Sequence, residues 1–114
     1  MSINISIDFD QKIFELDDTV MRQIVQELDK DCQVRLSDKG EMTLGVACAS
    51  YLMRDTERLP RSEKIRRTRL ARIAQRGGEH EVTPEQLALL RQCIEPAPAL
   101  LLEQVLELTG GADE

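Results

Sequence analysis

Apolar and polar residues alternate at the start of the chain. The apolar positions are Ile3, Ile5, Ile7 and Phe9, with short polar side chains between them. A period of two residues is typical of a strand with one buried face. A turn can follow Phe9, and residues 12–16 are predicted to form a second strand, which gives an N-terminal β-hairpin.

Helical spacing follows this segment. The apolar residues that recur at intervals of three and four are Met21, Ile24, Val25 and Leu28. This spacing predicts a helix over residues 19–30. Alternation returns in residues 32–36, which predicts a third strand that ends in a turn over residues 37–40.

The remainder of the chain is predicted to be largely helical. Thr43 can cap a helix over residues 44–53, whose small side chains indicate close packing by its neighbours. The next helix begins near residue 61 and ends at Arg76, before two glycines.

A capping box begins the third of these helices. Thr83 is the cap, Pro84 takes the first helical position and Gln86 completes the box. Prolines within residues 95–98 end this helix, and a last helix runs to about Thr109. Between the second and third helices, residues 79–82 form a short connection or strand.

These elements predict a helix-rich α+β fold, in which an N-terminal β-hairpin or small antiparallel sheet packs against four to five helices. The length of 114 residues suits a single domain over residues 1–114. Its strand–helix–strand part covers residues 1–36 and its helical part residues 43–109. The chain is 41% hydrophobic and only 3% aromatic, so the core is expected to be aliphatic.

Composition argues against several classes of protein. No apolar run is long enough to span a membrane, and the first ten residues lack the pattern of a secretory signal. Cys32, Cys48 and Cys93 are odd in number and far apart, which favours a reducing cytoplasm over a disulfide framework. Each lies among apolar residues, and we expect all three to be buried.

Charge is strongly segregated along the chain. Residues 58–76 carry eight basic side chains against Glu63 alone, although the whole chain has a net charge of −6. On a helical wheel, one exposed arc collects Arg61, Ile65, Arg69, Arg72 and Arg76. Arg66 falls on the apolar arc instead, where we expect it to pair with a carboxylate.

Two interpretations of the arginine arc stay open. The arginines can pair with acidic residues of the same domain, or they can bind an anionic partner through bidentate hydrogen bonds. That partner is an acidic protein, including a second copy of the chain, or a nucleic acid. Nucleic acid is the less favoured partner, because the pI is near 4.9, no aromatic residues lie among the arginines, and the last helix is acidic.

The last helix is apolar on most of its circumference. Leu101, Leu102, Val105 and Leu108 form a stripe at helical spacing, and Leu100 and Leu106 widen it. The helix is therefore either a covered core element or a subunit interface, and we identify Leu100, Leu102 and Leu106 as the interface candidates.

No motif for catalysis is found. His80 is the single histidine, and it lies between acidic residues in a polar segment. One histidine and three scattered cysteines make a metal site improbable, and no glycine-rich phosphate loop follows a strand. We therefore expect a protein that is not an enzyme and that has no metal or cofactor.

Residues 43–109 resemble a family of small, mostly uncharacterised tailed-bacteriophage proteins. The similarity lies in five segments, residues 43–47, 63–67, 70–73, 81–90 and 100–108. The resemblance implies a phage or prophage origin and no enzymatic activity, and it assigns no functional residues. Residues 17–35 depart from the family pattern.

The expected function is therefore binding of a phage or host protein in virion assembly or structure. The expected location is the host cytoplasm or the virion. Two alternatives are inhibition of a host defence system through the acidic flanks of the chain, and nucleic-acid binding through the arginine-rich helix over residues 61–76.

Overall fold

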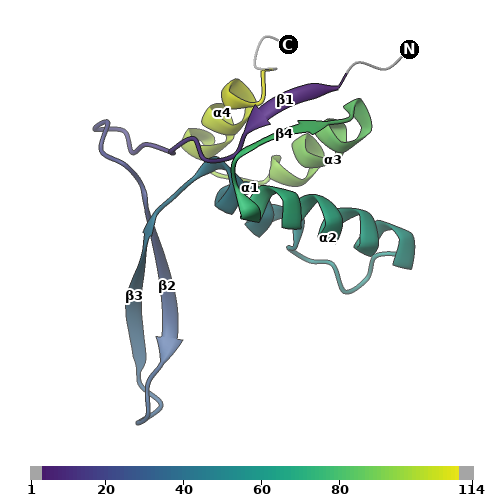
Figure 1. The fold of residues 1–114 in the computed structure, drawn as a ribbon. Helices are drawn as coiled ribbons and strands as arrows, with labels where there is room; N and C mark the ends of the chain where they lie inside the picture. The colour runs from purple at the N-terminus through teal and green to yellow at the C-terminus, as the bar shows by residue number, and fades with distance from the viewer. Residues whose placement is uncertain (1–3, 111–114) are drawn as a thin grey trace.

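The computed structural model describes residues 4–110, which contain four strands and four helices (Figure 1). The elements in chain order are β1 (Ile5–Asp8), β2 (Arg22–Leu28), β3 (Val34–Glu41), α1 (Leu44–Leu52), α2 (Arg61–Arg76), β4 (Glu79–Val82), α3 (Pro84–Ile94) and α4 (Ala99–Leu108). The strands form two antiparallel pairs, β1 with β4 and β2 with β3. The predicted helix-rich α+β class is confirmed.

The alternating residues at the start of the chain form β1, but its partner is not the predicted one. Ile5 lies opposite Val82 and Ile7 opposite His80, so β1 pairs with β4 from the second half of the chain. Ile3, the first alternating residue, lies outside the described residues. Ile7 and Val82 are buried, which explains the alternation.

The predicted second strand over residues 12–16 is wrong. Lys12 and Phe14 each form a single isolated bridge, with Thr43 and Val20. Ile13 is fully buried, and its backbone hydrogen-bonds to Met21 and Met42 rather than to β1. This segment therefore bonds to the residues that flank β2 and β3, and no glycine is present to turn it back along β1.

The four helices predicted after residue 43 are confirmed almost to the residue. The Thr43 hydroxyl accepts a hydrogen bond from the Val46 N–H at the start of α1, and Thr83 with Gln86 forms the complete capping box of α3. Gly77 ends α2 with a φ of +76°, a value that favours glycine. These signals are local, so they do not depend on tertiary contacts.

A mostly aliphatic core joins the helices to the β1–β4 pair. Its fully buried members include Ile7, Phe9, Leu44, Leu52, Leu70, Leu90, Ile94 and Val105. Gly45 brings α1 against α2, because a Cβ there would overlap the carbonyl oxygen of Ala74 and lie 3.1 Å from the Phe9 Cβ. The small residues of α1 thus serve close helix packing, as predicted.

The predicted helix over residues 19–30 is wrong, because residues 22–28 form β2. Ile24 and Leu28 share one side in a helix and also in a strand, so the spacing fits both structures. The β-branched Ile24 and Val25 favour the strand, and β3 supplies its partner. β3 also runs through the turn predicted at residues 37–40, with Gly40 at a register shift.

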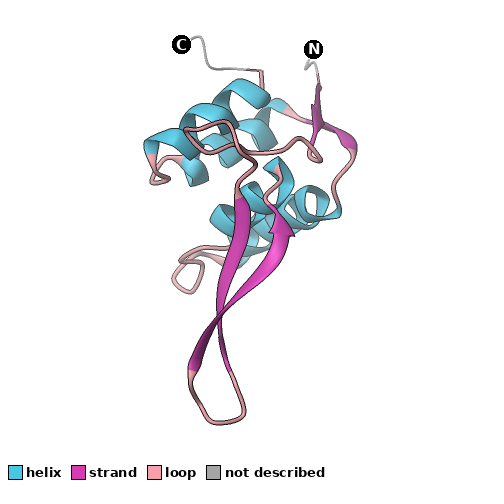
Figure 2. Cartoon of the chain, turned by 90° about the vertical axis from the view of Figure 1, so that its left-hand side faces the viewer, coloured by secondary structure: helices cyan, strands magenta, loops and turns pink. Residues whose placement is uncertain are grey.

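The β2–β3 hairpin projects from the rest of the molecule. In Figure 1 it extends away from the helices and from the β1–β4 pair, and Figure 2 shows it as a long twisted ribbon. We call residues 22–41 the arm and the other described residues the body. None of the buried core residues belongs to the arm. The arm is therefore attached to the body but does not contribute to its core.

Candidate protein-binding surfaces

The arm has two chemically different faces. Successive side chains of a strand point to opposite sides, and residues directly opposite each other in the register share a side. One side therefore carries the pairs Ile24 with Asp38, Gln26 with Leu36, and Leu28 with Val34. We call these six residues the apolar face of the arm.

The four aliphatic side chains of this face are largely exposed. The exposed fractions are 52% for Ile24, 70% for Leu28, 64% for Val34 and 71% for Leu36. Single exposed aliphatic residues are common on protein surfaces, whereas a contiguous group on one face is typical of an interaction surface. The apolar face is therefore the main candidate binding surface of the described chain.

The opposite face of the arm is suited to water. The Lys39 ammonium lies 2.6 Å from the Glu27 carboxylate, and the Arg35 guanidinium lies 3.5 Å from that of Asp29. Exposed ion pairs of this kind contribute little to stability, at about 0–1 kcal/mol each. Of the exposed large aliphatic residues of the arm, Val25 at 39% lies on this face, and the other four lie on the apolar face.

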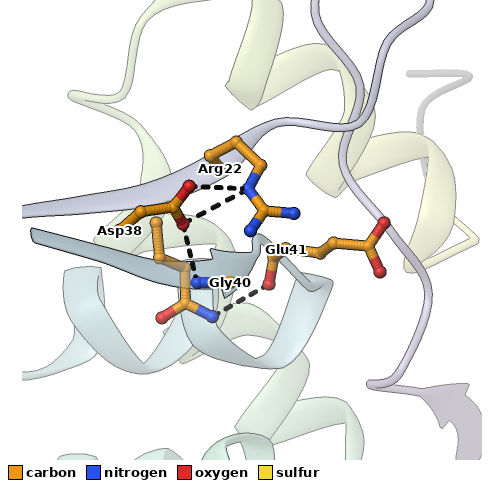
Figure 3. A network of polar contacts seen from close by, with 5 residues as sticks. Arg22, Asp38, Gly40 and Glu41 are labelled. Carbon is orange, nitrogen blue, oxygen red and sulfur yellow. Dashed lines mark hydrogen bonds and ion pairs between the residues drawn. The ribbon is translucent and has the colours of Figure 1, made fainter.

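A polar network holds the base of the arm (Figure 3). The Arg22 Nε–H donates to both carboxylate oxygens of Asp38 at 3.2 and 3.1 Å, and the Gly40 N–H donates to Asp38 at 2.9 Å. The Arg22 hydrogen bond is the main reason that the pKa of Asp38 is lowered. The link therefore persists above the ordinary carboxyl range and weakens as the pH falls through the lowered pKa.

Sequence reasoning missed the apolar face. Part of the signal was present, because Val34 and Leu36 alternate with Arg35 in the predicted strand, whereas Val25 and Gln26 break the alternation in residues 24–28. The helical spacing of the same segment obscured it. Only the pairing of β2 with β3 shows that these residues share one face.

The arginine arc predicted on the second helix lies on the exposed side of α2. Arg61, Arg69, Arg72 and Arg76 are exposed, as is Ile65 at 43%. We call these five residues the arginine face. Among the described residues, no carboxylate lies within 4.0 Å of these four guanidinium groups, so intramolecular pairing does not account for them.

Pairing within the chain occurs at the neighbouring arginines instead. Arg66 lies 3.1 Å and Arg67 3.7 Å from the Glu63 carboxylate. The expected carboxylate partner of Arg66 is thus present, but Arg66 is exposed and Arg67 is the more buried of the two side chains. Ala71 is buried whereas Ile73 is only half-buried, so the buried arc of α2 is centred closer to Arg67 than to Arg66.

A groove borders the arginine face. Its volume is about 450 Å³, and it lies between α1 and α2 at the base of the arm. Val46 and Met53 are apolar residues of its lining, and Gln23 and Arg72 are polar ones. A smaller hollow of about 280 Å³ shares Arg72 and continues toward Ile65. This combination suits a partner that has both aliphatic and acidic groups.

The three leucines predicted as interface candidates on α4 are half-buried. Leu100, Leu102 and Leu106 flank Val105, which is fully buried in the core. The Gln104 side chain accepts from the Phe14 N–H at 2.7 Å and donates to the Phe14 carbonyl at 2.8 Å, which fixes the segment before the arm. The leucines therefore offer less free apolar surface than the arm, and their role in an interface stays a prediction.

Chemically reactive groups do not converge within residues 4–110. No cluster of three metal-binding side chains is found there, and His80 is a half-buried residue of β4 rather than part of a loop. Cys48 is buried, which raises the pKa of its thiol to about 12, and burial also raises the pKa of Cys93. Cys32 is exposed in the loop of the arm, contrary to prediction.

No family model, curated protein or solved structure matches the chain. None of the helices in the described part of the chain is long and apolar enough to cross a membrane. The functional assignment therefore rests on the chain's own surfaces.

Proposed function

We propose that this chain is a non-enzymatic protein-binding module that acts in the assembly or structure of a phage particle. The observation that carries the proposal is the apolar face of the arm, with four aliphatic side chains more than half exposed on a ribbon that projects from the body (Figure 2). The resemblance of residues 43–109 to tailed-phage proteins supplies the biological setting, in the host cytoplasm or the virion.

The character of the surface favours a protein as partner. The four aliphatic side chains offer no hydrogen-bond donors for phosphates or bases, Gln26 offers a single amide, and a ribbon face is too open to enclose a small molecule. Protein interfaces place such aliphatic patches at their centre and surround them with polar groups. The Arg22–Asp38 ion pair at the base of the arm would form part of that polar rim.

Affinity capture with variants of the arm tests this proposal. The bait is the purified chain, and the extract comes from infected or lysogenic cells. The test variant is Leu28→Lys with Leu36→Lys, which places charge on the apolar face. The matched control is Val25→Lys with Ser37→Lys, a cross-strand pair on the opposite face that adds the same charge.

The wild type and the control are expected to retain a virion or assembly protein that the test variant loses. Capture of the same proteins by both variants would show that the apolar face is not the binding surface. Recovery of no virion or assembly protein by the wild type would refute the role in phage assembly.

Nucleic-acid binding is the second candidate function, and the arginine face favours it. Four exposed arginines without a carboxylate partner among the described residues are available for phosphates. Binding of a short DNA duplex would then fall steeply with salt and be lost in the variant Arg69→Glu with Arg72→Glu. A control with the same charge change elsewhere is Arg54→Glu with Arg58→Glu. Salt-insensitive binding, or none, removes this candidate.

A further inference from the structure

We infer that the partner of the apolar face is a second copy of this chain, so that two arms pack face to face about a two-fold axis. This inference rests on the proposed function, because it names the occupant of the same surface. Three properties of the arm support it: a single ribbon leaves its apolar face uncovered, the face carries little free charge, and two such faces bury enough area for a weak dimer.

A two-stranded ribbon is an incomplete structure by itself. An isolated hairpin is marginally stable in water, and a sheet gains its stability when another layer covers its apolar face. Beyond the base of the arm, the body supplies no such layer, because the four aliphatic side chains remain largely exposed. The identical face of a second arm supplies one layer of matching width and length.

The charge of the face permits contact with itself. Asp38 is its single ionisable residue, and Arg22 and the Gly40 N–H already bind that carboxylate. Two identical faces can therefore meet without repulsion between unpaired like charges. A strongly acidic or basic partner would gain nothing from this face, in contrast to the arginine face of α2.

The buried area sets the strength of this contact. Each aliphatic side chain offers roughly 60–120 Å² of apolar surface, so two faces together bury several hundred square ångströms from these side chains alone. Gln26 and the flanking backbone extend the total toward about 1,000 Å², the lower end for a specific interface. We therefore expect a dimer in the micromolar range that dissociates on dilution.

An antiparallel arrangement of the two arms fits the charge of the whole molecule. Each chain carries a net charge of −6, and antiparallel arms place the two bodies at opposite ends of the ribbon pair. In this arrangement the Gln26 side chains lie at the centre, where each amide can donate to the other. The two Cys32 thiols, at the tips of the arms, then lie about one strand length apart, which is roughly 25 Å.

Sedimentation velocity of the full chain from about 1 to about 200 μM tests the inference. The wild type is expected to shift from monomer to dimer over this range, and Val25→Lys with Ser37→Lys is expected to behave alike. Leu28→Lys with Leu36→Lys is expected to stay monomeric throughout. Because no core residue belongs to the arm, circular dichroism should show an equally folded body in all three proteins.

A spin label on Cys32, the exposed thiol among the three cysteines, measures the arrangement. A distance between labels near 25 Å in the dimer supports antiparallel arms, whereas a distance below about 15 Å overturns that arrangement and indicates tips that meet.

Two results would overturn the self-association itself. The first is a wild type that stays monomeric over the whole range. The second is a dimer that persists in Leu28→Lys with Leu36→Lys, which would place the interface elsewhere, with the leucines of α4 as the next candidates. In either case, a captured protein that still depends on Leu28 and Leu36 would leave the proposed protein-binding function in place. If the chain neither self-associates through the arm nor captures a protein that depends on Leu28 and Leu36, the proposed protein-binding function is refuted as well.

Discussion

Gly45 sets the distance between α1 and α2. A Cβ at this position would overlap the Ala74 carbonyl oxygen, which belongs to the backbone and cannot move aside easily. We expect Gly45→Ala to lower the free energy of unfolding by about 1–3 kcal/mol, because overpacking forces the two helices apart. Urea denaturation followed by circular dichroism measures this change.

The matched control for this variant is Ser50→Ala, which lies on the exposed side of the same helix. Its free energy of unfolding should stay within about 0.5 kcal/mol of the wild type. Equal stability of Gly45→Ala and Ser50→Ala would contradict the close approach of α1 and α2.

The three cysteines should differ sharply in reactivity. Cys32 is exposed in the loop of the arm, whereas Cys48 and Cys93 are buried and have raised pKa values. Treatment of the native protein with a maleimide near pH 7.5 should therefore add one label per chain, and unfolding in guanidinium should expose all three thiols. Mass spectrometry counts the labels, and two or three labels on the native protein would contradict the burial of Cys48 and Cys93.

The stability from burial of the Cys48 thiol also depends on pH. The pKa of Cys48 is about 12 in the folded protein and near 9 when the thiol is exposed by unfolding. The folded state therefore keeps a neutral thiol where the unfolded state has become a thiolate. Stability is expected to decline as the pH rises above about 9, and Cys48→Ala should reduce this decline. Thermal midpoints measured between pH 7 and pH 10.5 test the dependence.

Among the elements, α3 depends on its capping box. Thr83 accepts from the Gln86 N–H, while the Gln86 side chain accepts from the Thr83 N–H. We expect Thr83→Ala to cost about 1 kcal/mol of stability, since it leaves a helix N–H without its partner. Gln86→Ala, which keeps the hydroxyl, should cost less, and Gln92→Ala on the exposed side of the same helix serves as a neutral control in urea denaturation. A wild-type midpoint for Thr83→Ala would contradict this role.

The elements that could be predicted from sequence are those with local signals. α1, α2 and α3 begin and end at caps, glycines and prolines, and these residues act within one turn of the helix. The strands depend on partners distant in sequence. Ile5 and Ile7 alternate visibly, yet nothing in the sequence of β1 specifies pairing with β4. The segment around Ile24 fits two periods, and only the presence of β3 decides between them.

At the scale of the whole molecule, the same distinction separates the two candidate surfaces. The arginine face lies on one helix, so a helical wheel drawn from the sequence is enough to group its five members. The apolar face joins Leu28 with Val34 and Gln26 with Leu36 across two strands. Such a surface can be identified only when the register of the two strands is known. The register also shifts at the base of the arm, and the sequence does not reveal this irregularity.

The arm and the body should therefore be separable. Met21 and Met42 are joined by a backbone hydrogen bond of 2.6 Å where the chain enters and leaves the arm. Replacing residues 23–40 by a short glycine-containing turn keeps this bond and removes the apolar face. We expect the shortened chain to keep its helical circular dichroism, with a thermal midpoint within about 4–8 °C of the full chain, equivalent to about 1 kcal/mol.

The shortened chain should also remain monomeric at every concentration and capture no partner that depends on Leu28 and Leu36. Loss of helical signal would instead mean that the body needs the arm to fold, even though all of its buried core residues lie outside residues 22–41. A folded body that still dimerised would assign the contact to another surface. A folded, monomeric body would identify the arm as the binding element of this protein and the helical body as the scaffold that carries the arm.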